Sequence, residues 1–129
     1  YKGVNMQIGK SSENYLETIL MLSKQLPVVR SIDIASELNF SKPSVSIAMK
    51  HLREDGCIEM NPSGFITLTP KGMEIASTIY ERHTVLSKWL ISLGVDPEVA
   101  TADACEMEHH ISPESFQAMK AFIEKHANE

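Results

Sequence analysis

The chain has 129 residues, 43% of them hydrophobic, and a formal net charge of −5 at pH 7. This length suits one core, or a small domain with a helical extension that shares its packing. No apolar run approaches the ~20 residues that cross a bilayer, and two distant cysteines, Cys57 and Cys105, do not make a disulfide framework. We therefore expect a reduced, cytoplasmic protein with no membrane partner. The chain begins at Tyr1 and not at Met, so we expect this start to be a trimmed or tagged boundary.

The excess of acidic charge lies in the C-terminal part of the chain. Residues 1–83 carry nine Lys or Arg and nine Asp or Glu, whereas residues 84–129 carry three against eight. A negative net charge alone argues against a nucleic-acid partner, because phosphate neutralisation is the main source of non-specific affinity. The uneven distribution instead fits DNA binding at one end of the chain and cation binding at the other.

The first predicted helix covers residues 11–26. Its apolar residues recur at the spacing of one helix face, which is typical of an amphipathic helix. Ser11 and Ser12 are the predicted N-caps, and Pro27 is expected to end the helix.

The next two predicted helices form a helix-turn-helix pattern. Residues 32–38 make a short helix with Ser31 as its N-cap and Asn39 as its left-handed stop. After a three-residue turn, Ser41 caps the third predicted helix, with Pro43 in its first turn, where a missing N–H costs nothing. The outward side of this third helix carries residues suited to a major groove and its thymine methyl groups: Pro43, Ser46, Ile47 and Lys50. The alternative is three packed helices with a slightly apolar exposed face.

Residues 57–69 predict a β-hairpin, because two short β-prone runs flank an Asn-Pro-Ser-Gly turn. A hairpin directly after a recognition helix is the wing of a winged-helix domain. No Lys or Arg stands at the tip of this wing, so we expect little phosphate contact from it.

A long helix is predicted from Thr69 or Pro70 to about Leu93, ending at Gly94. Taken alone, His83 fits a hydrogen-bonded core histidine better than a metal ligand. The predicted buried seam of this helix, broken only by Arg82, consists of Ile75, Ile79, Leu86, Trp89 and Leu93.

The richest group of metal-ligand side chains lies on the helix predicted to follow Asp96. At ~100° per residue, Cys105, Glu108 and His109 project from one helix face. A thiolate, a carboxylate and an imidazole on one face suit a first-row transition metal. The alternative is a solvated acidic helix with a half-buried cysteine. A last helix is predicted to begin after Ser112.

With these elements in order, the chain resembles the diphtheria toxin repressor family, which includes iron-dependent repressors and the shorter manganese transport regulators. The resemblance implies a mainly α fold: a winged helix-turn-helix DNA-binding domain with a small β-hairpin wing over residues 1–72, then a helical metal-binding and dimerisation domain over residues 73–129. It also implies that the SH3-like domain of the long members is absent. The resemblance covers about residues 11–125 and rests on Asn14 to Ile19, Ser41 to Ser46, Leu68 to Gly72, Arg82-His83 and Cys105 to Ser112.

The resemblance also implies a set of metal ligands: Glu17, His83, Cys105, Glu108 and His109. Asn14 falls where the family usually has Asp or Met, and its neutral amide oxygen is a weaker donor. Ser87 and Thr101 fall where iron-type members have further ligands, and neither replaces an acid or an imidazole well. Cys105 is the residue of the iron-type members. We therefore expect Fe²⁺ or Mn²⁺, with Fe²⁺ slightly favoured.

The implied function is divalent-metal-dependent regulation of transcription, as a repressor of metal homeostasis genes, with the cation joining the DNA-binding and dimerisation halves. The expected partners are double-stranded DNA with a palindromic operator and a second copy of the chain. Two alternatives stay open: a winged-helix regulator of a small organic ligand, and a di-iron carboxylate enzyme. Such an enzyme needs two Glu-x-x-His pairs and the chain has one, so we expect no enzymatic activity. The residues expected to contact DNA are Ser41, Lys42, Pro43, Ser44, Ser46, Ile47 and Lys50.

Overall fold

The computed structural model describes residues 9–127, so the chain start at Tyr1 lies outside the described residues. The described residues form two compact units, 9–77 and 78–127, and the division between them falls inside the longest helix. We call them the N-terminal unit and the C-terminal unit. The predicted mainly α fold with one small hairpin is confirmed. The elements in chain order are α1 (Lys10–Gln25), α2 (Ser31–Leu38), α3 (Lys42–Glu54), β1 (Ile58–Met60), β2 (Ile66–Leu68), α4 (Pro70–Ser92), α5 (Pro97–Met107) and α6 (Pro113–Lys125).

Helix α1 begins earlier than its sequence signals predict. Its N-cap is Gly9, which makes no side-chain cap hydrogen bond, and the predicted N-caps Ser11 and Ser12 lie within the first turn. Those predicted caps are wrong because Gly9 already adopts the extended backbone conformation that a cap requires. The predicted stop is confirmed: Leu26, the C-cap, is extended, as expected of a residue that precedes Pro27.

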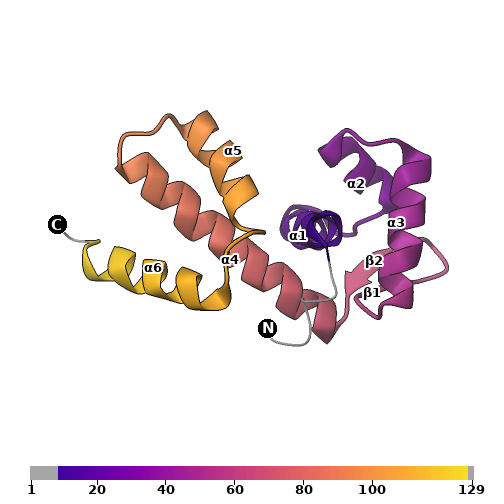
Figure 1. Ribbon diagram of the computed structural model, residues 1–129. Coiled ribbons are helices and arrows are strands. Elements are labelled where there is room, and N and C mark those ends of the chain that lie inside the picture. Colours follow the sequence, from indigo (N-terminus) through magenta and orange to yellow (C-terminus); the bar gives the residue numbers. More distant parts are fainter. Residues whose placement is uncertain (1–8, 128–129) are drawn as a thin grey trace. The chain divides into compact units, whose positions relative to one another are not determined.

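The helix-turn-helix is confirmed, with α2 and α3 joined by a three-residue turn (Figure 1). Asn39 ends α2 in the left-handed region, at φ 58°, as predicted. The N-cap of α2 is Arg30 and not Ser31, and its backbone N–H donates to the Asp33 carboxylate at 2.9 Å. Ser41 caps α3 as predicted, accepting a hydrogen bond from the Ser44 N–H at 3.3 Å. The buried side chains that hold α2 and α3 together are Ile34, Ala35, Val45, Met49 and Leu52.

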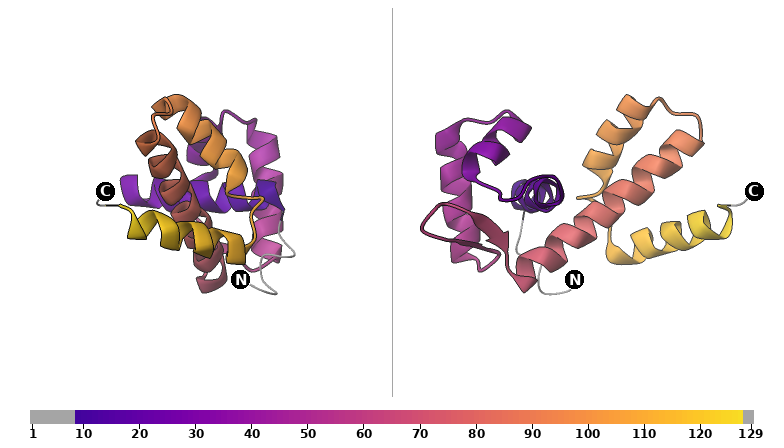
Figure 2. Two further views of the ribbon diagram at one scale, coloured as in Figure 1. Left: turned by 60° about the vertical axis from the view of Figure 1, so that its left-hand side comes forward. Right: turned by 180° about the vertical axis from the view of Figure 1, so that it is seen from behind.

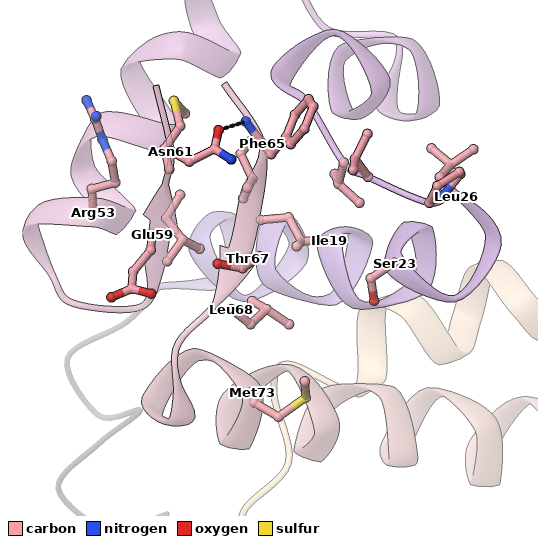
Figure 3. Close-up of a pocket in the computed structure, with 16 residues that line it drawn as sticks. Ile19, Ser23, Leu26, Arg53, Glu59, Asn61, Phe65, Thr67, Leu68 and Met73 are labelled. Carbon is pink, nitrogen blue, oxygen red and sulfur yellow. Dashed lines mark hydrogen bonds between the residues drawn. The ribbon is translucent and has the colours of Figure 1, made fainter. Parts of the chain in front are cut away.

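The wing is a two-stranded antiparallel hairpin, with Ile58 opposite Leu68 and Met60 opposite Ile66. A hollow lies in the N-terminal unit beside this hairpin, lined by residues of α1, the 26–29 loop, the hairpin, the first turn of α4 and Arg53 of α3 (Figure 3). Its lining is mostly aliphatic, and it holds none of the predicted metal ligands or DNA-contacting residues.

The C-terminal unit consists of the rest of α4 with α5 and α6, which lie on either side of it (Figure 2). One buried side chain from each helix forms its centre: Leu86, Ala104 and Phe116. The predicted seam of α4 is wrong at two positions. Leu93 is 63% exposed because it lies beyond the last helical turn, and Arg82, predicted as a break in the seam, is only 1% exposed. No helix of the described residues is long and apolar enough to cross a membrane.

Candidate metal centre and DNA-binding surface

Helix α5 carries Cys105 but ends before the predicted ligands Glu108 and His109. Asp96 caps its start by accepting the Glu98 N–H at 3.1 Å, and the helix stops at Met107. Glu108 is the C-cap, in a near-helical conformation, and His109 belongs to the turn that follows. The prediction that one helix face presents Cys105, Glu108 and His109 is therefore wrong for the histidine. The chain must turn here, because α6 begins four residues after His109.

Three of the predicted ligands nevertheless meet within the C-terminal unit. His83 of α4, Cys105 of α5 and Glu108 each offer one ligand atom, and these atoms all lie within 4.8 Å of one another. The Nδ1 atom of His83 is 3.2 Å from one Glu108 carboxylate oxygen, and Nε2 of His109 is 3.5 Å from the other. Each of the two histidines thus lies near a different oxygen of the Glu108 carboxylate.

The Glu108 carboxylate has an environment that suits a cation. Its side chain is fully buried, and no described residue donates a hydrogen bond to either of its oxygens. The approach of His83 satisfies the distance of a salt bridge but not the geometry of a hydrogen bond. A buried acceptor left unsatisfied costs about 1–3 kcal/mol, and more when it is charged. A thiol, an imidazole and a carboxylate are all ligand types of first-row transition metals, so these residues fit a divalent transition-metal cation.

The remaining positions that match family ligands lie on α1, α4 and α5. Glu17 and Asn14 lie three residues apart on α1, in the N-terminal unit. The hydroxyl of Ser87 donates to the His83 backbone carbonyl at 2.7 Å, so it serves the helix backbone. Thr101 is exposed on α5.

The predicted DNA-contacting residues share the exposed surface of α3. All of them are exposed, and Ile47 is 59% exposed, a large value for an isoleucine in a folded domain. The inner residues Val45, Met49 and Leu52 are at most 1% exposed, which fixes the opposite face of α3 outward. The exposed residues are Ser41, Lys42, Pro43, Ser44, Ser46, Ile47 and Lys50.

Two basic residues of interest, Arg53 and Arg82, were not predicted from the sequence. Arg53 is exposed on α3 three residues after Lys50, and this spacing could have marked it as a second basic side chain on the same helix. Arg82 is buried and donates hydrogen bonds to the backbone carbonyls of Glu108 and Ile111. No local signal identifies those partners, since they lie 26 and 29 residues further along the chain.

Two family models match the chain. The N-terminal DNA-binding domain of iron-dependent repressors matches residues 7–64. The metal-binding and dimerisation domain of the same repressors matches residues 69–128.

Individual proteins agree with these matches. The chain is 39% identical over 114 residues to the transcriptional regulator MntR of Escherichia coli O6:H1, and the match covers 88% of this chain and 74% of that protein. It is 33% identical over 120 residues to an uncharacterized HTH-type transcriptional regulator of Methanocaldococcus jannaschii, and this match covers 92% of this chain and 96% of that protein. The crystal structure of IdeR from T. acidophilum is similar with a TM-score of 0.72 and 27% identity, over 88% of this chain and 52% of that one.

Proposed function

Because the chain belongs to the family of iron-dependent repressors, metal-dependent transcriptional regulators with a DNA-binding domain and a metal-binding and dimerisation domain, we propose that a divalent cation switches its binding to DNA. We assign DNA binding to residues 1–72 and metal binding and dimerisation to residues 73–129. The regulation proposed is repression of metal homeostasis genes in the cytoplasm.

One observation carries the metal-binding part of this proposal. The fully buried Glu108 carboxylate accepts no hydrogen bond from the described residues, while a thiol and an imidazole place ligand atoms within 4.8 Å of it and of each other. His83, Cys105 and Glu108 are therefore proposed as the core of the site, with His109 as a further ligand. A bound cation supplies the positive charge that compensates the buried carboxylate and the thiolate.

Glu17 is proposed as the ligand that makes metal binding matter for DNA binding. It matches a ligand position of the family and belongs to α1, in the unit that also contains α3. As a ligand of the same cation, the Glu17 carboxylate adds metal affinity only when the N-terminal unit takes up one orientation. Metal and DNA then share a coupling free energy, typically ~1–3 kcal/mol. Asn14, one turn before Glu17, is the weaker candidate for an additional donor.

The proposed metal is Fe²⁺ or Mn²⁺, with Fe²⁺ favoured. The carboxylates of Glu17 and Glu108 suit either ion. The thiolate of Cys105 is a softer ligand than oxygen or nitrogen and therefore favours Fe²⁺ over Mn²⁺.

The proposed DNA target is a palindromic operator bound by a homodimer. A two-fold dimer presents two copies of α3 about 34 Å apart, which matches one turn of DNA. The exposed α3 residues from Ser41 to Lys50 contact base edges and phosphates, and Arg53 adds a further phosphate contact.

Metal titration of three variants tests this proposal. Glu108→Ala should abolish tight binding of Mn²⁺ or Fe²⁺. Glu17→Ala should bind metal more weakly, dimerise normally and bind operator DNA with little dependence on metal. Asp103→Ala, which removes an exposed carboxylate from α5, is the matched control and should behave as the wild type. Full metal-activated DNA binding by both Glu17→Ala and Glu108→Ala would show that these residues do not form the switch.

A further inference from the structure

Arg82 is a buried cation in the C-terminal unit, one residue before the proposed ligand His83. Its side chain is 1% exposed, and its guanidinium carbon lies 5.5 Å from the centre of the Phe116 ring. Its Nη1 atom donates to the backbone carbonyl of Glu108 at 3.1 Å and to that of Ile111 at 2.8 Å. The guanidinium is permanently charged and has no acceptor atom, so Arg82 cannot itself be a ligand.

These two hydrogen bonds span the turn that presents Glu108. The last carbonyls of a helix have no partner within the helix, and Glu108 is the C-cap of α5. A cation at a helix C-terminus satisfies such carbonyls and interacts favourably with the helix dipole. By holding the carbonyls of Glu108 and Ile111 together, Arg82 fixes the backbone on both sides of His109.

We propose that Arg82 is the positioning residue of the metal site, an inference that rests on the function proposed above. It anchors the Glu108 backbone to α4, the helix that also supplies His83, and so sets the 3.2 Å separation of the histidine nitrogen and the carboxylate in the absence of metal. The buried carboxylate is thereby held in its binding position, and the entropy of ordering the turn is not lost on metal binding.

The shape of the arginine side chain matters for this role. The guanidinium is planar and rigid, and one of its nitrogens reaches two carbonyls that lie three residues apart. A lysine at this position keeps the charge and has enough donors for both carbonyls, but its flexible side chain does not fix their direction as the rigid guanidinium does. Methionine fills a similar volume and donates none.

The test compares Arg82→Met and Arg82→Lys with two controls. Leu86→Ala weakens the core of the C-terminal unit without touching a proposed ligand. Lys120→Met removes a different cation that bridges α6 to α4, through the 2.6 Å contact of its Nζ atom with Glu81. The measurements are metal affinity by titration with Mn²⁺ and amide hydrogen exchange of residues 108–112 in the metal-free dimer.

Arg82→Met should lower metal affinity about 10–100-fold, the usual effect of removing a residue that orients a metal ligand. It should also speed hydrogen exchange at residues 108–112 before any metal is added. Arg82→Lys should fall between this variant and the wild type in both measurements, and it carries the test if Arg82→Met does not fold. Leu86→Ala should lower the melting temperature while keeping metal affinity, and Lys120→Met should keep both.

Wild-type metal affinity in Arg82→Lys and in folded Arg82→Met would overturn the inference. So would a loss of affinity that Leu86→Ala reproduces, because Arg82 would then act only through stability. Glu108→Ala in the same titration separates the two claims. If Glu108→Ala keeps wild-type metal binding, the proposed site is wrong; if it loses binding while Arg82→Met does not, only the role of Arg82 is wrong.

Discussion

Cys57 and Cys105 are chemically identical side chains in different environments. Cys57 precedes β1 and is fully buried, and this burial raises the pKa of its thiol, with a smaller upward contribution from Asp55 and a downward one from Lys71. Cys105 is only partly buried and belongs to the proposed metal site. Since the thiolate is the reactive form, the two residues should differ in reactivity.

Alkylation with iodoacetamide checks this difference. Cys105 should react in the metal-free protein and be protected by Mn²⁺, because its sulfur would then be a ligand. Cys57 should react only when the protein is unfolded. Peptide mass spectrometry after timed labelling distinguishes the two sites, and Cys57→Ala serves as the control with one reactive site. Faster labelling of Cys57 than of Cys105 in the native protein would contradict the assignment.

Two substitutions on the exposed face of α3 distinguish the two proposed kinds of DNA contact, to phosphate and to base. Lys50→Ala should weaken binding to all sequences and reduce the salt dependence by about one unit of slope, because a lysine contacts phosphate. Ile47→Ala should change base preference more than total affinity, because an aliphatic side chain contacts thymine methyl groups. Binding to specific and random DNA over a range of salt concentrations measures both effects. Equal losses on the two DNAs for Ile47→Ala would exclude direct readout by this residue.

The end of α3 is tied to the start of α4 within the N-terminal unit. The Thr69 hydroxyl donates to the Gly56 carbonyl at 2.6 Å, and the Lys71 ammonium donates to the Asp55 carbonyl at 2.8 Å. Gly72 packs so closely that a Cβ atom there would clash with the Cys57 carbonyl oxygen. The recognition helix is therefore held at its C-terminal end by the first turn of α4.

Gly72→Ala tests how closely these elements pack. In an open helix, replacing Gly by Ala stabilises by about 1 kcal/mol. Here the added carbon meets a backbone carbonyl that cannot rotate away, so we expect a loss of about 1–3 kcal/mol, as for an overpacked core. Urea unfolding measures the change, with Ser77→Ala, at an exposed position of the same helix, as control. A stabilised Gly72→Ala variant would contradict the close packing.

Elements governed by local signals were predictable from the sequence. Asn39 and Gly94 both adopt positive φ at helix ends, and Ser112 caps α6 by accepting the Ser115 N–H. The end of α5 was not predictable, because the hydrogen bonds of Arg82 to Glu108 and Ile111 join distant parts of the sequence. The same distinction between local signals and contacts of distant residues applies to the candidate metal site.

The identities of the ligand residues could be proposed from the resemblance. The burial of Glu108 and the position of His109 beyond the helix depend on the packing of α4, α5 and α6, which local sequence patterns do not encode.

The C-terminal unit exposes large apolar side chains that suit the dimerisation domain of the family. Leu93 is 63% exposed and Phe122 57% exposed. Leu93→Asp and Phe122→Asp should each weaken the dimer, because a charge buried at an interface is costly. Ile32→Asp, at an apolar position 51% exposed in the N-terminal unit, is the control. Sedimentation over a concentration range measures the equilibrium, and dimers of unchanged affinity in both variants would exclude these residues from the interface.

The switch proposed for this protein is a divalent cation that controls DNA binding through Glu17 and the ligands of the C-terminal unit. The operator is first selected from random DNA with metal-loaded protein. Fluorescence anisotropy then measures its affinity for the protein at one fixed salt concentration under three conditions: with Mn²⁺, with Fe²⁺ in the absence of oxygen, and with chelator. Metal should tighten binding of the wild type by about 5–150-fold. Glu17→Ala should show little such effect. Equal operator affinity of the wild type with metal and with chelator would exclude metal control of DNA binding.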